Sequence, residues 1–305
     1  MNSIEKNLLA QIADLHEVPM GAYNIREDGK LHSRNTTKNI DIISKTDKQG
    51  IEIRIKPGTK NESVHIPVII TKTGHTELVY NDFFIGENSD VLIVAGCGIH
   101  NSGCETSRHD GVHTFYLGKN SRIKYVEKHY GEGEGTGEKV MNPQTVVYME
   151  PGSYIEMETV QIKGVDSTKR HTKIEAGEGC EIVIIEKLMT HDRQSAVSEM
   201  DINLNGDGSK ARVISRSVAQ DDSEQTFYPS VTGNAQCFGH VQCDSIIMQN
   251  AKVRSIPAIN AFHVNAQLIH EAAIGKIAGD QLLKLMTLGL SEEEAEERIL
   301  SGFLK

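Results

Sequence analysis

The stretch from residue 97 to residue 113 concentrates side chains that bind metals. Its donors are Cys97, His100, Cys104, His109 and His113. Thiols and imidazoles suit zinc, but this spacing matches no standard zinc pattern. His109 and His113 are four residues apart, which we expect to share a face only in a helix, and Gly111 and the strand expected next argue against a helix. The stretch therefore favours hydrogen-bonded loop histidines over a zinc site centred on Cys97.

A second candidate site combines Cys243 with the dipeptide His270-Glu271. Cys243 and His270 are 27 residues apart, and residues one repeat apart would stack on neighbouring strands, about 4.8 Å from each other. Thiolate, imidazole and carboxylate suit iron or zinc, and a cysteine beside an imidazole can also be a nucleophile with its base. Because side chains alternate along a strand, only one of His270 and Glu271 is expected to face the thiol. The alternative is a core cysteine beside a capping His-Glu pair.

A glycine-rich segment, GEGEGTGEK, runs from Gly131 to Lys139. Such loops can cradle phosphates, but this one lacks the GK[ST] ending of a nucleotide-binding loop, and its glutamates would repel phosphate. We expect a flexible, solvated excursion. Since no other nucleotide fingerprint occurs in the chain, any ATP would have to be bound by another protein.

A repeated strand must position these residues. A small residue preceded within three positions by glycine recurs at spacings of 32, 32, 27 and 29 residues, namely Ser89, Ser121, Ser153, Cys180 and Ser209. The residues two positions later are Val91, Ile123, Ile155, Ile182 and Ala211, and those four positions later are Ile93, Tyr125, Met157, Ile184 and Val213. An apolar residue at every second position, repeated with a period near 30, predicts stacked strands that share one core, as in a parallel β-helix or a similar solenoid. The alternative is a β-sandwich, whose strands usually recur every roughly 8–12 residues.

The segments before and after the repeat have different patterns of apolar residues. Leu8, Leu9, Ile12 and Leu15 predict a helix before Pro19, and alternating apolar residues predict strands between residues 39 and 70. After residue 267, the sequence predicts a helix over 280–288 that ends at Gly289, and a second helix that begins with a Ser291–Glu294 capping box. We therefore expect an N-terminal helix and strands (1–60), a β-helix core (61–266) and a C-terminal helical partner-binding module (267–305).

The composition excludes several classes of protein. The chain has 305 residues with 32 Lys+Arg against 42 Asp+Glu, a formal net charge of −10, which argues against a nucleic-acid-binding surface. No apolar run approaches the roughly 18 residues of a membrane span, and the N-terminus lacks a signal-peptide pattern. Five cysteines in a chain of this size do not resemble a secreted disulfide framework. These features predict a soluble, cytoplasmic protein with reduced thiols.

Several segments resemble the SufB/SufD core family of iron–sulfur cluster assembly, especially its compact members. The resemblance rests on HVQCDSIIM (240–248), QLIHEAAIGKI (267–277), DQLLKLMTLGLSEEEA (280–295), ILSGFLK (299–305), VAGCGIHN (94–101), HDGVHTFYLGKNSRIKYVEKHYGEGEGTGE (109–138) and METVQIKGVDSTKRHTKIEAG (157–177). It covers the chain from about Gly21 onward.

This resemblance implies an all-β core, a right-handed parallel β-helix, with a C-terminal helical module that binds a SufC-type ABC ATPase. It implies a scaffold rather than an enzyme, working as a homodimer or a SufB/SufD-type heterodimer with a sulfur donor protein, on which a transient cluster of iron and sulfide is built. Cys243 and Glu271 match the positions implicated in SufB-like members, and His270 matches the one implicated in SufD-like members.

One departure concerns sulfur delivery. SufB members often carry a sulfur-accepting cysteine on the strand equivalent to 125–129, where this chain has Lys128-His129, so Cys180 or Cys97 would have to substitute. Two other functions stay open: a β-helix enzyme acting on polysaccharides, which the absence of Trp and the 5% aromatic content disfavour, and the zinc protein centred on Cys97.

Overall fold

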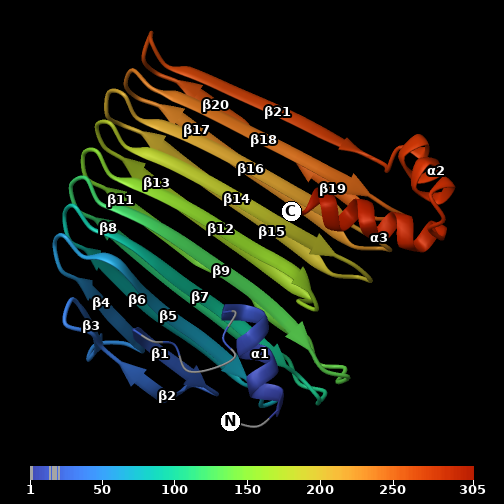
Figure 1. The fold of residues 1–305 in the computed structure, drawn as a ribbon, viewed down its shortest axis with the longest axis horizontal. Coiled ribbons are helices and arrows are strands. Elements are labelled where there is room, and N and C mark those ends of the chain that lie inside the picture. Colours follow the sequence, from blue (N-terminus) through green and yellow to red (C-terminus); the bar gives the residue numbers. More distant parts are fainter. Residues whose placement is uncertain (1–2, 14, 16–18, 20) are drawn as a thin grey trace.

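The chain winds into a parallel β-solenoid of about eight turns. The computed structural model describes residues 3–13, 15, 19 and 21–305. The remaining residues, at the N-terminus, include part of the stretch in which we found no signal-peptide pattern. Between residues 50 and 275 the chain alternates between two sheets, so each turn adds to each sheet one strand or a pair of short strands. Figure 1 shows these turns stacked from the blue N-terminal end to the red C-terminal end.

The elements of the described residues form two sheets and three helices. Sheet A contains, in spatial order, β2 (Lys30–Asn35), β1 (Ala22–Glu27), β5 (Lys60–Ile70), β7 (Asp90–His100), β9 (Arg122–Glu132), β12 (Tyr154–Lys163), β14 (Glu181–Thr190), β16 (Lys210–Ala219), β18 (Phe238–Ile247) and β21 (Gln267–Gly275). Sheet B contains β3 (Ile40–Ser44), β4 (Gly50–Ile55), β6 (Thr76–Ile85), β8 (Ser107–Leu117), β10 (Lys139–Met141) with β11 (Gln144–Met149), β13 (Ser167–Ala176), β15 (Ser195–Leu204), β17 (Glu224–Gly233), and β19 (Lys252–Ser255) with β20 (Ala258–Ala261). The helices are α1 (Ser3–Ala13), α2 (Gly279–Thr287) and α3 (Glu292–Phe303).

The predicted repeat is confirmed as the stack of sheet A. Each of the five small residues directly precedes a strand of this sheet, and these strands, β7, β9, β12, β14 and β16, are parallel neighbours in that order. Their apolar columns are in register, as in Val91↔Ile123 and Ile155↔Ile182. Ile155, Met157, Ile182 and Ile184 are at most 1% exposed. The period near 30 residues is one full turn, because each turn also contains a strand of sheet B.

The glycine-rich segment differs from our expectation of a solvated excursion. It lies directly on the preceding turn, residues 101–105, where Gly135 N–H donates to the Asn101 carbonyl and Gly137 N–H donates to the Gly103 carbonyl. A Cβ at Gly133, Gly135 or Gly137 would lie within 2.2–2.3 Å of a backbone oxygen of that turn. The alternating glycines therefore allow two backbones to pack without side chains between them.

The helix α1 packs on the outer face of sheet A. Its buried residues Leu8 and Ile12 lie over Gly96 and Gly98 of β7, and a Cβ on Gly96 would come within 2.6 Å of the Ile12 carbonyl oxygen. Leu9 is buried in the same hydrophobic cluster as Leu8, and Leu15 is partly buried against that cluster. The predicted N-terminal helix is thus confirmed over Ser3–Ala13, and its packing depends on two glycines that the helical pattern alone does not point to.

The C-terminal helices follow β21 and fold back over sheet A (Figure 1). Gly289, at φ +97°, ends the turn after α2, and Ser291 and Glu294 form the predicted capping box of α3. Leu300 and Leu304 pack against Val218 of β16. By contrast, α2 has no buried residue, and Leu283 is 61% exposed.

The predicted boundaries between an N-terminal segment, a β-helix core and a C-terminal module, at residues 60 and 266, stay a prediction. The structure adds that β21, inside the predicted C-terminal module, is a full strand of sheet A and pairs with β18. Among the described helices, none is both long and apolar enough to cross a membrane.

Candidate functional site at the C-terminal end of the solenoid

Cys243 and His270 lie together on the last two strands of sheet A. Cys243 is on β18 and His270 on β21, and the Cys243 Sγ–His270 Nε2 distance is 3.4 Å. Both side chains point to the inner face, where Cys243 is 3% exposed and His270 is half-buried. No described strand pairs with the other edge of β21. A thiol and an imidazole therefore meet at the open end of the solenoid.

The register behind this contact differs from our expectation. Residues 27 positions apart do not stack here, because β18 and β21 are offset by 29 residues, as in Phe238↔Gln267. His270 is directly opposite Val241, and Cys243 is opposite Ala272. The contact forms diagonally, between inward-facing side chains two residues apart along the strand, a distance that longer side chains can span.

Glu271 lies on the opposite face of the sheet, as strand alternation predicts. Its side chain is 64% exposed on the outer face, and its Oε2 lies 3.4 Å from Nε2 of His240 on β18. The structure thus brings Cys243 and His270 together but keeps Glu271 apart from them. His240 begins the HVQCDSIIM segment but was not predicted from the sequence as a site residue.

Burial sets the protonation of the thiol. Burial raises the pKa of Cys243 to about 12, against the opposing effect of a hydrogen bond with Ser255, and the charges of Glu186 and Asp244 raise it further. The pKa of His270 is lowered, by burial and by the nearby His240. Without a cation the pair is therefore a neutral thiol and a neutral imidazole, and metal binding would release the thiol proton.

A column of buried polar residues leads along sheet A to Cys243. Strand pairing aligns these residues in register in the order Glu127, Thr159, Glu186, Ser215 and Cys243. Ser215 and Ser198 both donate hydrogen bonds to the Glu186 carboxylate, at 2.8 and 2.7 Å. This column was not predicted from the sequence. The signal was present, since each residue lies six positions after a small residue that opens a repeat, and Cys237 is the next such opener.

The stretch 97–113 does not come together as one metal site. Cys104 is exposed in a turn, and His100 lies at the end of β7 with Glu132 3.4 Å away. Cys97, His109 and His113 point into the solenoid instead. Our expectation that His109 and His113 share a face only in a helix was wrong, because residues four apart in a strand also share a face, and both lie in β8.

The inward histidines take part in a buried polar network. His109 Nδ1 lies 3.0 Å from Glu77 Oε1, and His113 Nδ1 lies 2.7 Å from the Tyr125 hydroxyl. Burial lowers the pKa of His113 to about 4. Further along the axis, Arg170 binds the Glu127 carboxylate. These groups satisfy one another, which buried polar groups require.

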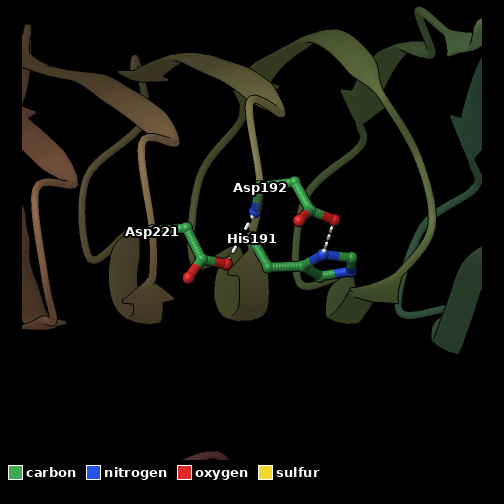
Figure 2. Close-up of side chains that lie close together, drawn as sticks. All are labelled: His191, Asp192 and Asp221. Carbon is green, nitrogen blue, oxygen red and sulfur yellow. Dashed lines mark hydrogen bonds and ion pairs between the residues drawn. The ribbon is translucent and has the colours of Figure 1, made fainter.

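One group of described residues has cation-binding spacing, and it lies in surface turns (Figure 2). Asp221 accepts a hydrogen bond from the Asp192 N–H at 2.9 Å, and His191 Nδ1 lies 2.7 Å from Asp192 Oδ2. Asp192 and Asp221 both have positive φ, at 53° and 57°. Each turn thus uses the next turn's side chain to satisfy its backbone, so this cluster has a structural explanation.

Comparisons with a family model and with individual known proteins agree on one family. Residues 69–303 match the SufBD core domain of the SUF system of FeS cluster assembly. An iron–sulfur cluster assembly SufBD family protein of Methanocaldococcus jannaschii is 27% identical over 256 residues, which cover 83% of this chain and 80% of that protein. A SufBD family protein of Methanothermobacter thermautotrophicus is 28% identical over 264 residues, covering 84% of this chain but 62% of its own length.

A shorter match reaches a bacterial relative. The iron–sulfur cluster assembly protein SufB of Bacillus subtilis is 33% identical over 97 residues, which cover 30% of this chain and 21% of that protein. The family match, the solenoid core and the C-terminal helix pair all agree with the expectations that the sequence motifs raised. The chain belongs to the SufBD family, and this membership supports a role in iron–sulfur cluster assembly.

Proposed function

We propose that this chain is a non-enzymatic scaffold on which iron and sulfide are assembled into a transient cluster at the open C-terminal end of the solenoid. The observation that carries the proposal is the Cys243–His270 contact of 3.4 Å beside the free edge of β21. Thiolate and imidazole are donors that iron accepts. A single thiol and imidazole cannot complete a cluster site, so a second chain supplies further donors.

The free edge of β21 supports a dimer at this end. An unpaired strand edge presents backbone N–H and C=O groups that another chain can pair with. Exposed apolar side chains lie on β21 and in the segment directly before it, including Phe262 at 76%, Val264 at 92% and Ile269 at 45% exposure. The second chain is a homodimer partner or a SufB/SufD-type heterodimer partner.

The C-terminal helices are the proposed binding element for a SufC-type ABC ATPase. The exposed apolar residues of α2, Leu283 and Met286, and the adjacent Leu288 at 75% exposure, form a patch that a partner would cover. Hydrolysis of ATP is assigned to this partner. The work takes place in the cytoplasm, without nucleic acid or membrane as a partner.

Sulfur is proposed to come from a donor protein. Of the two substitute cysteines, Cys180 is 0% exposed in the apolar core with its Sγ 3.2 Å from the Glu150 carbonyl oxygen. Cys97 lies in register with His129, beside the polar interior. Cys97 is 1% exposed and packs against apolar residues such as Ile99, but the interior beside it also contains His129 and Glu127, and these polar neighbours favour Cys97 over Cys180.

The test compares two buried cysteines of the same turn. Cys243→Ser replaces a soft thiolate donor by a hydroxyl, so iron retention and the thiolate–iron absorption after anaerobic reconstitution should be lost. Cys237→Ser is the matched control, since Cys237 is also buried, at 5% exposure, in the same hydrophobic cluster, but its Sγ lies beside Gly233 rather than His270. Full cluster retention by the Cys243→Ser protein would refute the proposal.

Glu271→Gln is the second variant that tests the proposed function. It keeps the side-chain volume and removes the charge, so assembly should weaken without unfolding of the chain. If Cys243→Ser only lowers the melting temperature and iron content is unaffected, Cys243 is a core residue and the site lies elsewhere.

A further inference from the structure

A groove of about 730 Å³ runs across the strands of sheet B at the ends where the chain leaves this sheet. The strands that border it are β4, β6, β8, β11, β13 and β15, which are neighbours in that order. At about 4.8 Å for each strand, the groove is about 24 Å long. None of its lining residues belongs to β18 or β21, so the groove is separate from the Cys243 site.

One wall of the groove is a stack of three aromatic rings from neighbouring strands, Phe84, Tyr116 and Tyr148. The ring centroids are 5.0 and 5.4 Å apart, and adjacent planes lie within 14° of each other. The three side chains are 37–44% exposed. Because the rings stack face to face, a ligand meets mainly their edges. Sugars bind to ring faces, so this wall does not suit a polysaccharide.

The floor of the groove consists of backbone. Gly86, Gly118 and Gly177 follow the strand ends, so no side chain projects there. The strands between β4 and β15 are already paired on both edges, which prevents addition of another strand. About 730 Å³ over this length leaves a cross-section of about 30 Å², which accommodates one extended chain but not an α-helix about 10 Å across.

The groove also offers hydrogen-bond donors. Tyr116 and Tyr148 both line it, and neither hydroxyl is hydrogen-bonded to another of the described residues. A polyproline II helix has backbone carbonyl groups without internal partners. Grooves lined by aromatic side chains bind such helices, because the rings pack against proline and their polar atoms donate to the carbonyls.

The charges that line the groove leave a negative excess. Arg54 is paired with Glu52 at 2.7 Å, and Glu175 is paired with Lys173 at 3.0 Å. Glu150 accepts a backbone N–H hydrogen bond, but no cation of the described residues lies within 4.0 Å of it. The unpaired carboxylate stands beside the last ring of the stack, where it complements a basic side chain.

We propose that this groove binds a proline-rich segment of a partner protein, in the polyproline II conformation and with a basic residue next to Glu150. The rings of Phe84, Tyr116 and Tyr148 pack against the prolines. The groove thereby provides an interaction surface that uses neither the open end of the solenoid nor the C-terminal helices.

The probe is a fluorescein-labelled peptide of one arginine followed by eight prolines. A second version has the arginine at the other end, because a polyproline II helix can bind in either direction. Fluorescence anisotropy is measured with the full chain, and one of the two versions should bind saturably. Replacing the arginine by glutamate should weaken binding at least about tenfold, because like charges then meet at Glu150.

Tyr148→Ala should weaken binding about tenfold or more, since aromatic residues dominate the energy of such interfaces. Tyr148→Phe keeps the ring stack and removes only the hydroxyl, so it should weaken binding less. Glu150→Gln should make the arginine and glutamate peptides bind about equally. Tyr228→Ala is the matched control, because Tyr228 is 40% exposed on β17 of the same sheet but does not line the groove. Its affinity should equal that of the wild type, and thermal unfolding shows that each variant is folded.

Three results would overturn the inference: no saturable binding of either arginine peptide by the wild type, equal affinities of the wild type for the arginine and glutamate peptides, or equal losses for Tyr148→Ala and Tyr228→Ala. Calorimetric titration with cellohexaose tests a sugar as the occupant instead. Binding of this sugar in a manner that depends on Tyr148 would also contradict the inference. Since no cluster is assembled in these measurements, their outcome is independent of the proposed function.

Discussion

The two ends of the solenoid differ in how their apolar core is covered. At the N-terminal end, β2 and β3 pair antiparallel with β1 and β4 and complete sheets A and B. Arg34 on β2 reaches across this end, donating to the Asn24 side chain and to the Ser44 hydroxyl at 2.8 and 3.0 Å. Ile40, on β3 itself, faces the core and is 0% exposed.

At the C-terminal end, both sheets stop at parallel strands. β21 ends sheet A, and the short strands β19 and β20 end sheet B. Apolar side chains around them stay exposed, such as Ile256 at 49% and Phe262 at 76%. A solenoid needs a cover at each end. The contrast teaches that the chain covers the core with its own antiparallel strands at one end and leaves apolar side chains exposed at the other, where we propose that a partner binds.

The largest expected effect comes from two phenylalanines that represent the two ends. Phe83, at 0% exposure, stacks on Phe115 with ring centroids 4.2 Å apart, so Phe83→Ala should cost about 3–5 kcal/mol of unfolding free energy. Phe262→Ala should leave the unfolding free energy of the monomer unchanged within about 0.5 kcal/mol. Urea denaturation measures both. Comparable losses would mean that the open end is packed in solution.

The next effect concerns a buried charge near the closed end. Burial raises the pKa of Glu77, but its hydrogen bond with His109 and the charges of His109 and Arg26 outweigh burial and bring the pKa from 4.5 to about 2. A depressed carboxyl pKa stabilises the fold above the unfolded-state pKa, and this stabilisation is lost as pH falls from about 4.5 toward 2. The shift corresponds to about 3 kcal/mol.

Glu77→Gln isolates that contribution from the other carboxylates. The variant should lose about 3 kcal/mol at neutral pH and show a shallower decline in stability between about pH 4.5 and pH 2 than the wild type. Glu271→Gln is the control at the open end, and we expect it to change the unfolding free energy of the monomer by less than about 0.5 kcal/mol. Parallel pH profiles for wild type and Glu77→Gln would contradict the assignment.

A smaller effect on stability, with a large effect on binding, is expected from removing residues 279–305. The solenoid should stay folded and lose about 2 kcal/mol, since the deletion uncovers Val218, against which Leu300 and Leu304 pack. Co-purification with a SufC-type ATPase should disappear. Retained binding would place the ATPase on the solenoid itself.

The smallest expected effect tests the capping box at the start of α3. The Ser291 side chain accepts a hydrogen bond from Glu294 N–H at 3.2 Å, so Ser291→Ala should cost about 1 kcal/mol of local helix stability. Hydrogen exchange of α3 measures this loss directly. Protection of β9 and β12 should not change, and a global loss of protection would show that α3 is part of the cooperative core.

The sequence alone predicted the stacked strands of sheet A, because every turn repeats the same local requirements. A small residue opens each strand, apolar residues follow at every second position, and glycine allows the turn. The capping box of Ser291 and the left-handed Gly289 were predictable for the same reason, since each depends on residues within a few positions. The candidate site was predictable in part: Cys243, His270 and Glu271 were identified, and alternation placed His270 and Glu271 on opposite faces.

Only the tertiary structure decided how the turns are offset and which side chains meet. Turn lengths vary, so the 29-residue offset between β18 and β21 depends on the packing of the whole turn, and it places His240 beside Glu271 and His270 diagonal to Cys243. The glycine-rich segment packs against residues 101–105 because two backbones come close in space, which no local pattern shows. Contacts between turns join residues about 30 positions apart, and their register is a property of the stack.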